Sequence, residues 1–177
     1  MNFYQHNISG VKLIELTSHI DQRGSLTRFF CQEQLSNQEI VFDVKQCNLS
    51  INKESSTLRG FHYQKEPFSE QKLLSCIKGK IYDVVVDLRP TSTSYLRWES
   101  FELDATSKNC LYIPAGCANA FLTLEEETQI FYWHSAFFNA ESYTGFRYND
   151  PLFNIDWPET PSIISDKDAS YPNFAVN

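Results

Sequence analysis

Long apolar stretches are missing from this 177-residue sequence. No apolar run approaches the roughly 18 residues that a helix needs to cross a bilayer. The N-terminus lacks the charged, apolar and small-residue order of a signal peptide. The five cysteines are odd in number and form no CxxC pair, the spacing typical of zinc and redox sites. We therefore expect a cytoplasmic protein with reduced thiols and no membrane partner.

Positive charge is scarce as well. The chain has 15 Lys and Arg against 22 Asp and Glu, which gives a formal net charge of −7. Such a chain has no basic field that would collect a phosphate backbone, so we expect no nucleic-acid partner. A small anionic ligand would need a few locally placed cations instead.

Proline and glycine, which interrupt helices and strands, are few: the chain has seven Pro and six Gly. No Ser/Gly linker, charge block or internal repeat divides the sequence. A chain of this length is about one domain and can bury one ample core. We predict a single domain over residues 1–177. Its aromatic content of 15% favours β-structure, because aromatic side chains suit pleated, half-buried surfaces.

Eight segments alternate with period two or form short β-branched runs, which is the pattern of strands. They are 11–16, 44–51, 73–77, 81–88, 98–103, 110–113, 120–124 and 129–134. The best helix candidate is short and covers residues 33–38. Many short strands separated by turns predict an all-β sandwich, jelly roll or barrel.

Polar and apolar residues alternate in the segment 44–51. Gln46, Asn48 and Ser50 should face one side of the strand, and the apolar residues between them the other. If the apolar side packs against another sheet or a partner, the polar side lines a cavity. The alternative is an ordinary strand with a solvated polar face.

A histidine stands in the run LRGFHYQ at 58–64. A single histidine in a strand is commonly structural, but Arg59 and Lys72 favour a functional role for His62. Two cations near a histidine and a polar strand can receive a phosphate and polarise a carbonyl.

Two other chemistries compete for this region. Small β-barrels often hold a metal through an H-x-H pair, but the residue two beyond His62 is Gln64. His6, His19 and His134 show no ligand spacing either, so we expect no metal. No cysteine stands in a glycine-rich or helix-start context that would activate its thiol, which argues against a cysteine nucleophile.

The segment SDKD at 165–168 follows a proline-containing stretch. One interpretation is a solvated helix cap. The other is a carboxylate that returns to orient a histidine. Spacing alone does not distinguish them.

Ten short motifs occur in a specific order between about residues 21 and 168. They are DQRG (21–24), QCNLS (46–50), LRGFHYQ (58–64), QKL (71–73), YDVVVDLR (82–89), IPAG (113–116), Tyr132, YNDP (148–151), IDWP (155–158) and SDKD (165–168). In this order they resemble the 4-dehydrorhamnose 3,5-epimerase family of dTDP-sugar metabolism. The resemblance implies a cupin-type jelly roll, or double-stranded β-barrel, with short peripheral helices, and a homodimer that needs no metal or organic cofactor.

The resemblance also implies roles for individual residues. His62 would be the base, Asp168 its orienting partner, Tyr132 the acid on the opposite face of the sugar and Lys72 the cation on the enolate oxygen. Arg23, Gln46, Asn48, Arg59 and Lys167 would hold the nucleotide diphosphate. Inverting a carbon beside a ketone removes a proton from one face and returns one to the other, so two groups are needed.

Four positions depart from the family pattern. Asn119 stands where the family has a histidine, and it can donate a hydrogen bond to a sugar oxygen but cannot carry charge. Phe138, in a Phe-Phe pair that usually reads Tyr-Tyr, keeps a stacking surface and loses a hydroxyl. Arg28 and Tyr143 appear where the family uses glutamates. We therefore predict retained proton chemistry on a different sugar or at one carbon only.

The predicted function is inversion of C3, C5 or both in a nucleotide-linked 4-keto-6-deoxyhexose. A ketoisomerase that moves the ketone from C4 to C3 is an alternative that product NMR separates from an epimerase. A protein that binds the nucleotide-sugar without turning it over is another. Saturable binding without solvent exchange would support that last alternative.

Overall fold

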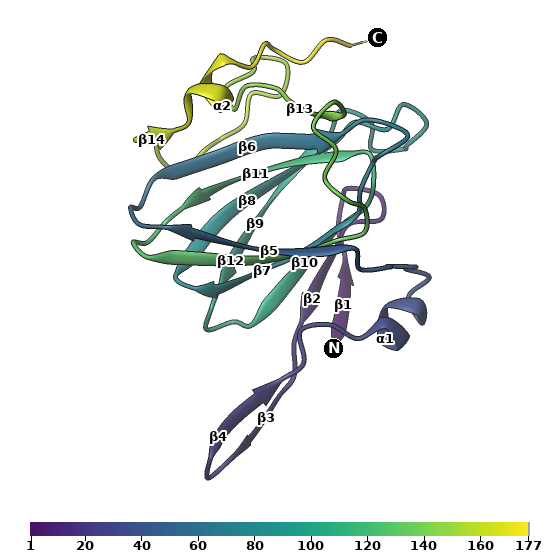
Figure 1. The fold of residues 1–177 in the computed structure, drawn as a ribbon, viewed down its shortest axis with the longest axis vertical. Helices are drawn as coiled ribbons and strands as arrows, with labels where there is room; N and C mark the ends of the chain where they lie inside the picture. Colours follow the sequence, from purple (N-terminus) through teal and green to yellow (C-terminus); the bar gives the residue numbers. More distant parts are fainter. Residues whose placement is uncertain (177) are drawn as a thin grey trace.

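The computed structural model describes residues 1–176, and two β-sheets facing each other form its body (Figure 1). The first sheet has the order β1 (Asn2–Gln5), β2 (Lys12–Glu15), β10 (Asn109–Ile113), β7 (Lys72–Lys78), β12 (Thr128–His134) and β5 (Gln46–Asn52). The second has the order β13 (Tyr143–Gly145), β6 (Thr57–Gln64), β11 (Cys117–Thr123), β8 (Lys80–Asp87) and β9 (Trp98–Asp104), with β14 (Ile163–Ile164) paired to β6. The all-β prediction is confirmed.

A separate hairpin and two short helices complete the chain. β3 (Ser18–Asp21) and β4 (Gly24–Thr27) pair only with each other and extend away from the sheets at the bottom of Figure 1. α1 (Gln32–Ser36) and α2 (Asp166–Ser170) each have five residues. No helix in the described part of the chain has the length and apolar character needed to span a membrane.

All eight predicted strand segments fall on strands. The helix predicted at 33–38 is α1, which ends earlier than predicted because the chain turns at Glu39, a residue with φ of 61°. The LRGFHYQ run lies on β6. The other strands that the alternation does not predict are β1, β3, β4, β13 and β14, all of four residues or fewer. Segments this short contain too few positions for an alternation to be recognised.

The space between the sheets is filled at one end by a buried apolar cluster. Leu74 from β7, Ile81 from β8, Leu103 from β9, Leu111 from β10 and Ile130 from β12 are completely or almost completely buried in it. Burying one such side chain stabilises the fold by about 1.5–3 kcal/mol. This cluster holds the sheets together and leaves the polar residues of the same strands around the other end.

A second cluster fixes the C-terminal segment to the outer face of β6, β8 and β11. Phe61 of β6 stacks on Phe146 with ring centroids 4.6 Å apart, and Phe153 and Trp157 pack in the same cluster. In Figure 1 this segment passes over β6 on its way to α2. The packing therefore determines where α2 lies relative to the residues of β6.

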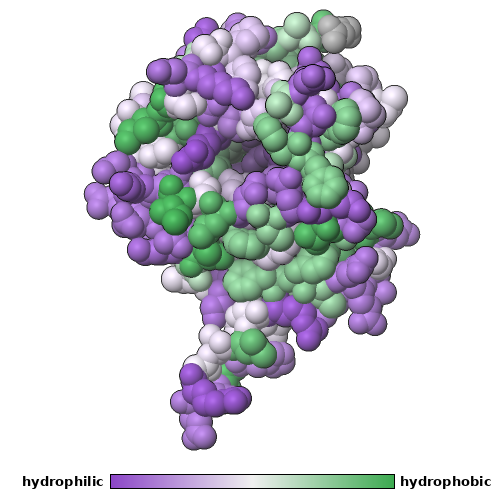
Figure 2. All heavy atoms as spheres, in the orientation of Figure 1, coloured by the Kyte–Doolittle hydropathy of each residue, from purple (hydrophilic) through white to green (hydrophobic). Residues whose placement is uncertain are grey.

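The outer side of β5 is exposed. Leu49 and Ile51 keep 49% and 53% of their surface exposed. Packing of this apolar side against another sheet or a partner is the condition under which the polar side is expected to line a cavity, and within residues 1–176 no sheet covers it. Figure 2 shows apolar side chains gathered across the middle of the face in view.

Candidate active site

A polar cavity of about 330 Å³ lies between the two sheets, walled mainly by β5, β6, β7, β11 and β12. Its lining residues are Gln46, Asn48, Leu49, Ser50, Arg59, His62, Glu70, Lys72, Asn119, Phe121, Tyr132, His134, Phe138 and Tyr143. Gln46, Asn48 and Ser50 of the segment 44–51 line this cavity, which is the first of the two alternatives that the alternation leaves open. Of the site residues predicted from sequence, all but Arg23, Lys167 and Asp168 line it.

His62 is paired with a carboxylate that reaches it from α2. Its Nε2 donates to Oδ1 of Asp168 at 2.7 Å, although the two residues are 106 positions apart. Burial raises the pKa of the Asp168 carboxyl, but the hydrogen bond and charge of His62, with the hydrogen bonds from Gly60 and Ser165, together outweigh burial, and this pKa lies below its ordinary value. A carboxylate only accepts, so the ring proton is on Nε2 and Nδ1 keeps its lone pair. A neutral imidazole in this tautomer can act as a base.

The backbone around His62 completes this arrangement. The N–H of Gly60 donates to the other Asp168 oxygen at 3.1 Å. Gly60 has a φ of +118°, and a Cβ there would lie 2.6 Å from Ala120, so only glycine fits. Ser165 caps α2 by accepting from the N–H of Asp168 at 3.1 Å. The two interpretations of the SDKD segment are therefore compatible, because one residue caps the helix and another orients the histidine.

Lys72 places a buried ammonium beside His62. Its Nζ donates to the carbonyl of His62 at 3.2 Å and to Oδ1 of Asn119 at 2.9 Å. An oxygen of Glu70 lies 3.6 Å away. These contacts hold the cation in one position, where it can stabilise negative charge that develops on a ligand.

Asn119 is committed to the protein at both ends of its amide. Its Oδ1 accepts from Lys72, and its Nδ2 donates to Oδ2 of Asp83 at 3.2 Å. We expected this side chain to donate to a sugar oxygen, and the structure gives it the additional task of positioning Lys72. Asp83 is fully buried, and burial raises the pKa of its carboxyl to about 8. Sequence reasoning gave Asp83 no role, because its place in the YDVVVDLR motif does not reveal what it faces.

The raised pKa of Asp83 has a consequence for stability. The unfolded chain releases this proton near pH 4, whereas the folded chain holds it to about pH 8. The unfolded state binds fewer protons between these values, so stability falls as pH rises. Relative to Asp83→Asn, the free energy of unfolding of the wild type should fall by up to about 1.4 kcal/mol per pH unit in this range. Urea unfolding at several pH values measures the slope.

The control for this comparison is Asp43→Asn, which changes an exposed aspartate paired with Lys45. Its profile should run parallel to the wild type. Parallel profiles for Asp83→Asn as well would show that the buried carboxyl is ionised throughout.

Aromatic side chains form the wall on both sides of His62. Burial raises the pKa of Tyr132 well above its ordinary value, so its hydroxyl keeps its proton at neutral pH. The Tyr143 ring lies 5.1 Å from the His62 ring and 5.2 Å from the Phe138 ring. Lys167 does not line the cavity, but its Nζ lies 4.7 Å from the centre of the Tyr143 ring. Tyr143, a departure from the family pattern, thus contacts both the His62 ring and the Phe138 ring.

Two predicted ligand residues are held by neighbours on the cavity wall. Nε of Arg59 donates to Asn52 at 2.8 Å, and Oε1 of Gln46 accepts from the N–H of Phe138 at 2.8 Å. Gln64, which stands where a metal-binding H-x-H pair would need a histidine, donates to the carbonyl of Phe137 and accepts from the N–H of Asn139. These bonds attach the loop after β12 to the barrel. Within residues 1–176, no cluster of three or more metal-ligating side chains is present.

Arg23 lies outside the cavity. It is in the turn of the β3–β4 hairpin, pairs with Asp21 at 2.6 Å and has 85% of its side chain exposed. The hairpin extends away from the sheets, so within one chain the structure does not bring Arg23 to His62 (Figure 1). Arg28, at the base of the hairpin, lines a separate cavity with His19.

Comparison with known proteins identifies the family. The family model described as dTDP-4-dehydrorhamnose 3,5-epimerase matches residues 5–176. This chain belongs to that family. An epimerase of this family from Sinorhizobium fredii is 36% identical over 98% of the chain and 90% of its own length. This chain is therefore an isomerase of the epimerase type.

Solved structures of family members agree with the fold. The Bacillus anthracis epimerase, solved with TDP and pyrophosphate bound, has a TM-score of 0.94 and 34% identity over 98% of this chain and 99% of its own. ChmJ, a 3'-monoepimerase from Streptomyces bikiniensis solved with dTDP-quinovose, has a TM-score of 0.88 and 30% identity over 95% of this chain and 85% of its own. The predicted cupin-type jelly roll is thereby confirmed.

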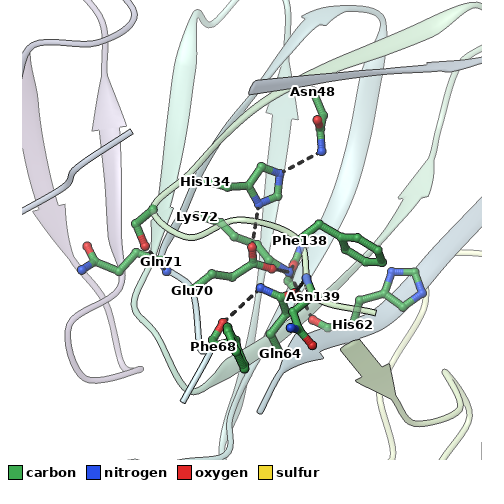
Figure 3. A network of polar contacts seen from close by, with 12 residues as sticks. Asn48, His62, Gln64, Phe68, Glu70, Gln71, Lys72, His134, Phe138 and Asn139 are labelled. Atoms are coloured by element: carbon green, nitrogen blue, oxygen red, sulfur yellow. Dashed lines mark hydrogen bonds and ion pairs between the residues drawn. The ribbon is translucent and has the colours of Figure 1, made fainter. Parts of the chain in front are cut away.

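Sequence reasoning missed two residues in the cavity of this epimerase. Glu70 and His134 both line it, and Oε2 of Glu70 lies 3.0 Å from Nδ1 of His134 (Figure 3). His134 was considered only as a metal ligand without the right spacing. The available signal was its position two residues after Tyr132, because alternate residues of a strand share one face.

Proposed function

We propose that this epimerase acts on a dTDP-linked 4-keto-6-deoxyhexose and inverts C3, C5 or both. The observation that carries the proposal is the His62–Asp168 pair, which stands beside a buried ammonium in a cavity large enough for a ligand. Two solved relatives hold TDP and dTDP-quinovose, which supports a thymidine nucleotide.

The first step of the proposed mechanism is proton removal. Nδ1 of His62 takes the proton from the carbon next to the C4 ketone, and the electron pair moves onto the C4 oxygen as an enolate. Asp168 stabilises the imidazolium that forms. Lys72 faces the developing charge, and a positioned cation in a site that excludes water contributes several kcal/mol to such a step.

The second step returns a proton to the opposite face. Tyr132 holds its proton at neutral pH and gives it to the carbon as the enolate collapses to the ketone. The hydroxyl is then protonated again from solvent, and His62 releases its proton, so no group is consumed. Two groups on two faces are what distinguishes inversion from simple exchange.

The nucleotide is assigned to the polar wall of β5 and its neighbours. Gln46, Asn48 and Arg59 supply amide and guanidinium groups, and Phe138 supplies a flat surface for the base. Lys167 adds a cation beside Tyr143. A guanidinium is suited to a diphosphate because its N–H groups form a fixed fork.

We further propose that the protein works as a homodimer. The hairpin residues Ile20 and Leu26 are 81% and 73% exposed, and Leu49 and Ile51 form an apolar strip on β5. Contact with a second chain would cover these side chains and would give Arg23 a site to reach. Light scattering should report a mass of two chains, and a monomer at micromolar concentration would contradict the proposal.

The function is tested by solvent exchange. Incubation of the dTDP-4-keto-6-deoxy sugar with the protein in deuterated water should place deuterium at C3, C5 or both, and NMR identifies the carbon. A product whose carbonyl carbon has moved to C3 would indicate a ketoisomerase. Saturable binding without deuterium at either carbon would leave only a binding function.

A further inference from the structure

A second histidine–carboxylate pair lines the cavity that His62 also lines. The Glu70 carboxylate precedes β7, and His134 is the last residue of β12. Their side chains keep 6% and 11% of their surface exposed. Neither residue has a role in the proposed proton transfers.

The charges around this pair determine which ring nitrogen of His134 carries the proton. Burial raises the pKa of Glu70, but the hydrogen bonds and charges of His134 and Lys72 together outweigh burial, so this pKa lies below its ordinary value. Glu70 is therefore a carboxylate, which only accepts, and Nδ1 of His134 donates to it. In the neutral ring Nε2 is then the acceptor, and Nδ2 of Asn48 lies 3.4 Å from it.

This bond fixes the orientation of Asn48. With the amide nitrogen turned to His134, the amide oxygen has no partner within residues 1–176 and is the end left for a ligand (Figure 3). Without the imidazole acceptor, the amide could turn over and present a donor instead. A ligand that donates to Asn48 would then lose its partner.

The same pair contacts two further residues of the site. Oε1 of Glu70 lies 3.6 Å from Nζ of Lys72, while Oε2 holds His134. The His134 ring stacks beside Tyr132, with ring centroids 5.8 Å apart and planes at 21°. Glu70 and His134 thus contact Asn48, Lys72 and Tyr132, which come from three different strands.

We propose that Glu70 and His134 are positioning residues, which hold Asn48, Lys72 and Tyr132 in the orientation that binding and proton transfer need. This inference rests on the proposed function, because those three residues matter only if the cavity is the active site. Neither residue takes a proton from the sugar.

Two substitutions of His134 separate its hydrogen bonds from its bulk. His134→Phe keeps a ring against Tyr132 and loses both bonds, so the dTDP dissociation constant should rise about tenfold. His134→Gln offers one donor to Glu70 and one acceptor to Asn48, so its dissociation constant should stay within about threefold of the wild type. Isothermal titration calorimetry with dTDP measures both.

Glu70→Gln tests the carboxylate. A carboxylate accepts from His134 and Lys72 at once, but an amide has one oxygen and turns N–H groups toward the other donor. We expect a weaker dTDP complex and slower deuterium exchange at saturating sugar, each by about tenfold. Since Gln has nearly the size of Glu, a purely space-filling role would leave both quantities unchanged.

A matched control is the pair formed by His6 and Glu99, which is partly buried and lies outside the cavity. Its Nδ1–Oε1 distance is 3.1 Å. His6→Phe and Glu99→Gln should leave dTDP affinity and exchange at wild-type values. If the Glu70 and His134 variants behave like these controls, the inference is wrong.

One test uses only the wild-type protein, so its outcome does not depend on whether a variant folds. Nitrogen-15 NMR of the histidine rings should find His134 protonated at Nδ1 and unprotonated at Nε2, and the reverse tautomer would overturn the inference. Calorimetry and NMR also require no turnover. A protein that binds dTDP and shows this tautomer but exchanges no deuterium would contradict the proposed function and leave the positioning role intact.

Discussion

Replacing His62 with alanine should lower deuterium incorporation at C3 and C5 by about 10²–10⁴-fold. The ring is the only imidazole of the cavity whose Nε2 is held by a carboxylate and whose Nδ1 has no partner among the described residues. Asp168→Asn should cause a loss of similar order. Its amide oxygen can accept from the N–H of Gly60, and its NH₂ then faces His62 and moves the ring proton onto Nδ1. Rates of exchange followed by NMR measure both effects.

His6→Ala provides the comparison, since it removes a histidine that also contacts a carboxylate but lies outside the cavity. Its exchange rate should match the wild type. Calorimetry with dTDP confirms that the His62 and Asp168 variants still have a folded binding site. If His62→Ala binds dTDP and exchanges deuterium at the wild-type rate, another residue is the base.

Tyr132→Phe should separate inversion from exchange. His62 alone can remove a proton and return a deuteron to the same face, so exchange into recovered substrate should continue. Inversion should fall by about 10²–10⁴-fold, because no acid remains on the opposite face. The measured quantity is the ratio of deuterium in recovered substrate to deuterium in inverted product.

Tyr63→Phe removes a comparable hydroxyl from the other side of β6, where Tyr63 packs with the outer aromatic cluster. It should leave the ratio unchanged. Equal losses of exchange and inversion in Tyr132→Phe would mean that this tyrosine acts before the enolate forms. The proposed division of work between His62 and Tyr132 would then be wrong.

Much of this site could be predicted because it lies on strands whose alternation is visible in the sequence. Gln46 and Asn48 face the cavity for the same reason that Ile51 is exposed on the outer side of β5. His62, by contrast, gained its predicted role from a family resemblance. No local pattern connects it to Asp168, which packing of the outer aromatic cluster brings within 2.7 Å.

Three features of the candidate site and its surroundings could not be read from the sequence, and the reasons are physical. Asp83 has its raised pKa because of burial, which depends on all the elements around it. Glu70 and His134 are 64 residues apart and meet only because β7 and β12 are neighbours in the sheet. Arg23 is predicted as a ligand residue. A family resemblance does not say whether the hairpin that carries it reaches the cavity of its own chain or that of a second chain.

The position of Asp168 near the C-terminal end determines when, during synthesis of the chain, it can pair with His62. Every strand from β1 to β12 ends by residue 134, so both sheets can pair before Asp168 is made. A nascent chain at that stage has His62 in place but lacks the carboxylate that selects its tautomer. Because chains are made from the N-terminus onward, the His62–Asp168 pair forms only after the strands that surround the cavity have been made. The proposed base activity of His62 would therefore be absent from a ribosome-bound barrel until the segment with α2 has packed over β6.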